Sequence, residues 1–203
     1  MSHMINRYAL IVVIMLSALV LLAGCSNITG DPREKANTAV ADANDSIAKH
    51  NKLFEKARNT YADVKKKVES GDDPSKEKKD ITQAKNTLQE ARGNLQDARG
   101  SLDGVKDLDG DSTVKKYASL LSDAMDAQIS AEAKEIQFYG ILEKDPALKD
   151  QRKDALDILS QVSDGYKKAE DAYGKARDLA NKNPKVLGPA SKTPKDKAGK
   201  TGG

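Results

Sequence analysis

Apolar residues recur at intervals of three and four along most of the chain, which is the spacing that places side chains on one face of an α-helix. Four such segments follow one another, and short stretches rich in Asp, Gly and Pro separate them. The predicted helices span residues 32–70, 74–106, 111–144 and 147–182. No segment has the alternating pattern of a half-buried β-strand. The pattern therefore predicts an all-α protein.

The second and third predicted helices differ in the period of their apolar faces. In the second helix, large residues repeat every seven positions, at Ile81, Leu88, Leu95 and Leu102. Small residues fill the fourth position of each repeat, which is typical of a coiled-coil seam. The third helix takes several consecutive steps of four, along Val114, Ala118, Leu121, Met125, Ile129, Ala133, Ile136 and Gly140. These steps predict local unwinding of a left-handed supercoil.

Short connections between helices of similar length place each helix antiparallel to the next. We therefore expect residues 32–183 to form an antiparallel up-down-up-down four-helix bundle with coiled-coil-like seams. A three-helix bundle with one displaced helix, or a dimer of helical hairpins, would bury the same apolar faces.

A nearly continuous apolar run covers residues 8–23, with Arg7 in front of it. The run ends in Leu22-Ala23-Gly24-Cys25, which resembles the lipobox of prokaryotic lipoproteins. This resemblance implies that residues 1–24 are a signal peptide and that Cys25 carries a diacylglyceryl group and a further acyl chain such as palmitate. Two acyl chains anchor a protein stably, because each buried methylene contributes about 0.8 kcal/mol. Residues 25–31 would then form the lipidated cysteine and a short tether.

The alternative interpretation of this apolar run is an uncleaved transmembrane helix. The run is shorter than the roughly 20 residues that span a bilayer. We therefore expect a protein that is anchored by lipid at Cys25 on the extracytoplasmic side of a prokaryotic membrane.

Charged residues make up 32% of the chain and aromatic residues 4%, so small apolar side chains must supply much of the core. The net charge of +3 is too balanced for a dedicated nucleic-acid-binding protein. The single cysteine excludes an intramolecular disulfide. Residues 184–203 read as a disordered, Lys-rich tail, which is either a solvated end or a contact for anionic polymers or lipid head groups.

Four aromatic residues fall at similar heights in the half of the predicted bundle that lies away from the membrane. They are Phe54, Tyr61, Phe138 and Tyr139. They are candidates for lining a small apolar ligand pocket between helices, where bundles often bind ligands. Simple core packing is the alternative.

Three glycines share one face of the second predicted helix, because Gly93, Gly100 and Gly104 are spaced by seven and four. Each glycine in a helix costs about 1 kcal/mol relative to alanine. The stripe is therefore a candidate face for close approach of a partner, and a tolerant solvent-facing surface is the alternative.

His50 occupies an apolar position in the first predicted helix. We expect it to be buried and to fix the register between helices. It would lie level with Tyr166 and share a hydrogen bond with the hydroxyl group of that residue. A metal site would need further ligands on facing helices, and the mature chain has no second histidine. A run of aspartates at 107, 109 and 111 resembles a calcium loop but lacks its glycine and glutamate, so we expect a turn in which Asp111 or Ser112 caps the next helix.

The sequence contains no catalytic triad, metal-ligand cluster or phosphate-binding loop. We therefore expect no enzyme activity, no cofactor and no metal. The leading hypothesis is a lipid-anchored helical bundle that acts as a structural or protein-interaction module of the cell envelope. Its expected partners are the membrane and an envelope protein or anionic polymer. The alternative is a ligand-binding or sensory bundle with its pocket at the aromatic residues.

Overall fold

The computed structural model describes residues 32–106 and 111–187. Most residues in these two ranges are helical, and none of them forms a strand. The long helices are α2 (Pro32–Glu69), α3 (Lys78–Lys106), α4 (Ser112–Lys144) and α5 (Arg152–Lys182). A 3-10 helix, η1 (Pro74–Glu77), precedes α3, and a short helix, α6 (Pro184–Leu187), follows α5. The prediction of an all-α protein is confirmed.

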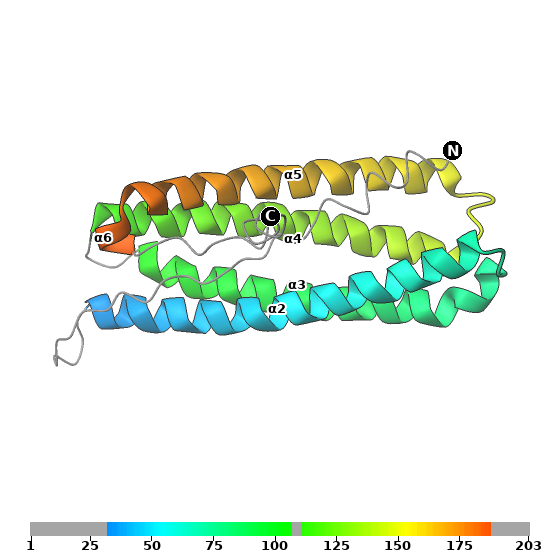
Figure 1. The fold of residues 1–203 in the computed structure, drawn as a ribbon, viewed down its shortest axis with the longest axis horizontal. Coiled ribbons are helices and arrows are strands. Elements are labelled where there is room, and N and C mark those ends of the chain that lie inside the picture. The colour runs from blue at the N-terminus through cyan, green and yellow to red at the C-terminus, as the bar shows by residue number, and fades with distance from the viewer. Residues whose placement is uncertain (1–31, 107–110, 188–203) are drawn as a thin grey trace, which may run out of the picture.

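The four long helices lie lengthwise beside one another (Figure 1). Packing is closest between α2 and α3, between α3 and α4, and between α4 and α5. One end of the molecule holds the start of α2 and the end of α5. The other end holds the α2–α3 turn and the α4–α5 loop (Figure 1).

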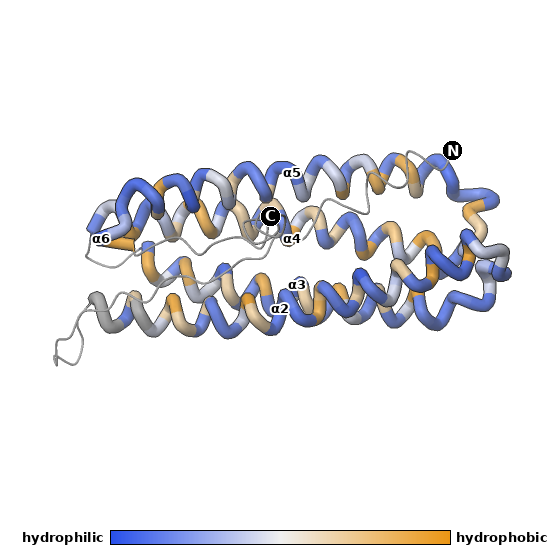
Figure 2. Tube along the Cα trace, in the orientation of Figure 1, coloured by the Kyte–Doolittle hydropathy of each residue, from blue (hydrophilic) through white to orange (hydrophobic). Residues whose placement is uncertain are grey.

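Hydrophobic and hydrophilic residues are interspersed along every long helix (Figure 2). The seven-residue repeat of α3 is buried, and its leucines Leu88, Leu95 and Leu102 are each 0% exposed. Full burial of one leucine side chain contributes about 1.5–3 kcal/mol. The regular seam that the sequence predicts for this helix is therefore a main part of the core.

The buried face predicted for the third helix is right in its first half and only partly right in its second half. Met125 of α4 is buried, but Ala133, Ile136 and Gly140 are only partly buried. The core-facing residues there include the polar Gln128, Glu132, Glu135 and Tyr139 beside the apolar Ala131, Phe138 and Leu142. Steps of four, three and four place the four polar side chains on one face of the helix. The core of this region is therefore polar as well as apolar.

Helix α5 begins at Arg152, five residues after the predicted start at Ala147. The side chain of Asp145 accepts hydrogen bonds of 2.8 to 3.1 Å from the backbone N–H groups of residues 149–151. These bonds hold the segment as a capped loop. They also lower the pKa of Asp145, with the bond from Lys149 contributing most.

Helix α3 also starts later than predicted, because its first turn is the separate 3-10 helix η1. Asp73 caps this turn by accepting a hydrogen bond of 3.0 Å from the backbone N–H of Ser75. Pro74 follows the cap, and proline is favoured at the first position of a helix. The regular α-helix then runs from Lys78.

Residues 184–187, which the sequence analysis placed in the tail, form α6. The backbone N–H groups of Val186 and Leu187 donate to the carbonyl oxygen of Asn183. Leu187 is buried, so it extends the apolar core by one residue beyond the predicted end of the bundle.

Several predicted features lie outside the described residues. They are the signal peptide and Cys25 within residues 1–31, the aspartates at 107 and 109, and the tail at 188–203. Asp111 is described, and it caps α4 as predicted by accepting a hydrogen bond from the backbone N–H of Thr113. Among the helices of residues 32–106 and 111–187, none is long and apolar enough to cross a membrane.

Candidate functional site

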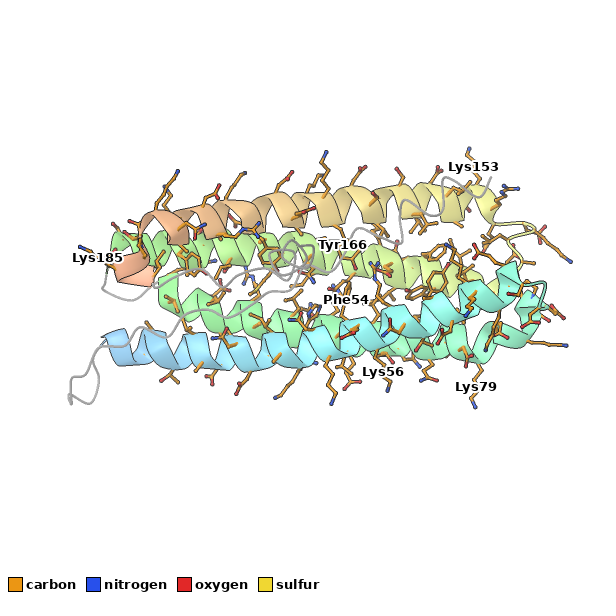
Figure 3. All side chains as sticks on the ribbon, in the orientation of Figure 1. Phe54, Lys56, Lys79, Lys153, Tyr166 and Lys185 are labelled. Carbon is orange, nitrogen blue, oxygen red and sulfur yellow. The ribbon has the colours of Figure 1, made fainter. Side chains whose placement is uncertain are left out.

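Polar side chains gather between the helices near the middle of the molecule. Apolar side chains usually occupy such buried positions. We call this group the polar core layer. Its members are His50 and Arg58 of α2, Gln128, Glu132, Glu135 and Tyr139 of α4, and Tyr166 and Tyr173 of α5. Phe54 borders the layer, and Figure 3 shows Phe54 and Tyr166 near one another at mid-length between α2 and α5.

Glu132 is the most deeply buried charged residue of the layer, with 0% exposure. Its Oε1 atom lies 2.8 Å from His50 Nε2 and accepts a second hydrogen bond of 2.9 Å from the Gln128 amide. Tyr173 donates its hydroxyl hydrogen to Gln128 Oε1 at 3.0 Å. The Oε2 atom of Glu132 has no hydrogen-bond partner within the part of the chain that the structure describes. Both contacts of the Glu132 carboxylate are therefore made by its Oε1 atom.

Glu135 lies one helical turn from Glu132, and both of its carboxylate oxygens accept hydrogen bonds. Tyr166 donates to its Oε2 atom at 2.6 Å, and Tyr139 donates to its Oε1 atom at 2.8 Å. Arg58 Nη2 donates to Oε2 at 2.9 Å. Glu135 therefore joins α2, α4 and α5 through a single carboxylate, and charge-assisted hydrogen bonds of this kind are stronger than neutral ones.

Arg58 closes the layer toward the solvent, and its side chain is 26% exposed. Its guanidinium group lies 4.9 Å from the ring centre of Phe54 and 5.1 Å from that of Tyr166, within cation–π range. Burial lowers the pKa of Arg58, but Glu135 and the neighbouring tyrosines outweigh burial and raise the pKa above its ordinary value. The guanidinium group therefore stays charged.

The layer confirms one prediction about His50 and corrects another. His50 is buried as predicted, with 1% exposure. Its partner is Glu132 of α4 instead of Tyr166, whose hydroxyl group bonds to Glu135. Phe54 separates the two predicted partners, because its ring stacks on His50 at 5.4 Å and meets the edge of Tyr166 at 6.0 Å.

Three of the four aromatic residues of the predicted pocket lie together. Tyr61 is 5.8 Å from Phe138 and 5.0 Å from Tyr139, and Phe138 is 5.8 Å from Tyr139, measured between ring centres. These distances are typical of favourable aromatic packing. Phe54 instead packs on His50 and Tyr166, at the border of the polar core layer. The three rings are in contact with one another and form part of an apolar core cluster.

The surface between α2 and α3 has an open hollow of about 530 Å³ near the α2–α3 turn. Its lining is polar and consists of Thr60, Asp63, Lys66, Lys67, Ser70, Asp72, Asp80 and Gln83. None of the four aromatic residues lines this hollow. It is therefore distinct from the pocket that the sequence predicts.

The three glycines of the candidate partner face lie on an open side of α3. A methyl group added at Gly93, Gly100 or Gly104 would meet no described atom within 4 Å. No other described helix therefore uses this face for close approach, and its role in binding a partner stays a prediction.

Within residues 32–106 and 111–187, no three His, Cys, Asp or Glu side chains are placed to hold a metal ion. What the polar core layer provides is a set of buried charges with directed hydrogen bonds. Comparison with protein-family models, curated proteins and solved structures finds no match for this chain.

Proposed function

We propose that the protein is a lipid-anchored helical module of a prokaryotic cell envelope with a structural or protein-interaction role. The observation that carries the proposal is the lipobox-like sequence ending at Cys25, directly before a long helical domain. Only residues 26–31 separate Cys25 from the start of α2 at Pro32. A tether of this length keeps the helical domain next to the membrane.

We propose further that the four long helices form an antiparallel up-down-up-down bundle with coiled-coil-like seams. Two kinds of contact support this arrangement. The heptad positions of α3 are buried between helices. Side chains also link helices that are distant in sequence, as in the contacts of His50 with Glu132 and of Phe54 with Tyr166. A rigid rod of this kind suits a spacer or docking element.

The anchor is tested by Cys25→Ala in the full chain, expressed in a bacterium that processes lipoproteins. We expect the wild type to be cleaved before Cys25 and to carry acyl mass, because the lipid is attached to the thiol. The variant should accumulate as an uncleaved precursor without acyl mass, as measured by mass spectrometry. Ser26→Ala is the matched control and should be processed like the wild type. A Cys25→Ala protein with the mature mass and unchanged membrane partition would contradict the proposal.

The second candidate function is a ligand-binding or sensory bundle. The polar core layer favours it more than the aromatic residues do, because the three rings pack on one another. Buried charges cost stability unless they are well paired, and hydrophobic residues of similar size often replace them without loss. Two buried glutamates on the core-facing side of one helix therefore point to a role beyond packing.

A further inference from the structure

One carboxyl oxygen of the polar core layer has no hydrogen-bond partner among the described residues. It is the Oε2 atom of Glu132, whose side chain is 0% exposed. The Oε1 atom of the same group makes both protein contacts, at 2.8 Å from His50 Nε2 and 2.9 Å from the Gln128 amide nitrogen. A half-turn of the carboxyl group only exchanges the two oxygens. One of them therefore lacks a partner in either orientation.

Glu135 of the same helix shows the contrast, because Tyr139 donates to its Oε1 atom and Tyr166 and Arg58 donate to its Oε2 atom. Nearly all buried polar atoms of folded proteins have a hydrogen-bond partner, which is either a protein group or an ordered water molecule. The Nε atom of Arg58 is also buried without a partner, but the side chain of Arg58 is 26% exposed and reaches solvent. Glu132 has no such access to solvent.

The Oε2 atom needs a partner in every protonation state of Glu132. An ionised carboxylate accepts hydrogen bonds at both oxygens. In a carboxylic acid with its proton on Oε1, the Oε2 atom is a carbonyl oxygen and still accepts. With the proton on Oε2, that atom becomes a donor and needs an acceptor. A partner that fits all three forms must be able both to donate and to accept.

Size and chemistry restrict the partner further. Full burial of Glu132 leaves no place beside it for a ligand of many atoms. An ammonium ion donates hydrogen bonds but accepts none. A metal ion needs several ligands, and no three His, Cys, Asp or Glu side chains within residues 32–106 and 111–187 are placed to hold one. Water is small, donates and accepts, and typically makes about three hydrogen bonds when it is buried in a protein.

Tyrosine hydroxyls of α5 supply further hydrogen-bonding groups around this carboxyl group. Tyr173 donates to Gln128 Oε1 at 3.0 Å, and the amide nitrogen of Gln128 donates to Glu132. Tyr166 donates to Glu135, one helical turn from Glu132. The oxygen of a tyrosine hydroxyl accepts hydrogen bonds as well as donating one. The surroundings of Glu132 are therefore polar, as a buried water molecule requires.

We propose that Glu132 Oε2 binds one water molecule inside the polar core layer. The water donates to Oε2 when this atom presents a lone pair, and accepts from it when it carries the proton. Its remaining hydrogen bonds go to the tyrosine hydroxyls of the layer. The water completes the contacts of Glu132, whose Oε1 atom is held by His50 and Gln128. This site does not depend on the proposed lipid anchor.

The first test is a crystal structure of the full chain in detergent, at a resolution that shows ordered water. We expect a water molecule within about 3 Å of Glu132 Oε2. Glu135 is the internal control, because protein groups already occupy both of its oxygens, so its carboxylate should bind no buried water. An Oε2 atom of Glu132 that contacts protein atoms alone would overturn the proposal.

The second test is ¹⁷O magnetic relaxation dispersion, which counts the water molecules held inside a protein in solution. Glu132→Met has a side chain of similar length without carboxyl oxygens and should hold one long-lived water fewer than the wild type. Glu170→Met is the matched control, because Glu170 is an exposed glutamate of α5, and it should leave the number unchanged. An unchanged number in a folded Glu132→Met protein would contradict the proposal. If this variant does not fold, the crystal structure of the wild type decides.

Discussion

Each of the three most deeply buried tyrosines donates its hydroxyl hydrogen to a polar side chain of α4. Tyr139 and Tyr166 donate to Glu135, and Tyr173 donates to Gln128. Burial raises the pKa of all three hydroxyls well above the ordinary value, and the nearby glutamates raise it further. A phenolate at any of these positions would break its hydrogen bond and add a negative charge beside buried carboxylates.

We predict that these tyrosines ionise only when the protein unfolds in alkali. Because their folded pKa lies above the unfolded value near 10, the stability they contribute is present below about pH 10 and lost as the pH rises through the folded values. Tyrosinate absorbance and helical circular dichroism, followed together in a pH titration, measure this. Tyr173→Phe should remove one late-ionising group. Ionisation of all six tyrosines near pH 10 with the helices intact would contradict the prediction.

Sequence analysis predicts the burial of His50 but not the identity of its partner. The apolar residues spaced around His50 in α2 predict that this histidine is buried. The residue type alone does not predict burial of the glutamates of α4, because glutamate usually lies on the surface. The spacing of Gln128, Glu132, Glu135 and Tyr139 is the signal that was available, since these residues follow one helix face as regularly as an apolar seam does.

At the scale of the helices, the distance to the facing helix determines at which positions a glycine is needed for packing. A methyl group added at Gly165 of α5 would lie 2.8 Å from the Cβ atom of Ala131 on α4. This distance is too short for two carbon atoms, so the absence of a side chain allows α4 and α5 to approach at this point. Nothing in the sequence distinguishes Gly165 from other glycines of these helices, because close approach depends on the facing helix.

We predict opposite effects for alanine at two helical glycines. Gly165→Ala should destabilise the fold by about 1–3 kcal/mol, because the added methyl group overpacks the contact with Ala131. Gly93→Ala should stabilise it by up to about 1 kcal/mol, because that position is open and alanine favours the helix. Urea unfolding measures both changes. Ala131→Gly should relieve the loss in Gly165→Ala, and a loss of equal size in the two alanine variants would rule out the close contact.

The sequence predicts the four helices well, and it misplaces the starts of α3 and α5 for a local reason. Periodicity reports a helical face, but a side chain that captures backbone N–H groups can end or delay a helix. Asp145 holds three such groups before α5, and Asp73 holds one before α3. The same periodicity indicates where apolar seams lie but not how they pair, so the arrangement of the four helices needs the contacts between them.

At the scale of the whole molecule, length and the position of the anchor determine what the protein presents. Helix α2 has 38 residues, which corresponds to about 57 Å. Its first residue follows Cys25 by seven positions. If Cys25 is lipidated, the end of the molecule with α6 lies next to the membrane and the α2–α3 turn lies farthest from it (Figure 1).

Three exposed lysines test this orientation, because Lys185, Lys56 and Lys79 lie in that order along the axis of the molecule, from the end with α6 to the end with the α2–α3 turn (Figure 3). Each is replaced by cysteine in the lipidated protein and labelled with a fluorophore on a liposome whose head groups carry a quencher. Cys25 does not react with the label, because its thiol is acylated. We predict quenching that falls from Lys185→Cys to Lys56→Cys to Lys79→Cys, since contact quenching requires the label to reach the surface. Equal quenching at the three positions would show a molecule lying flat, and the reverse order would place the anchor at the other end.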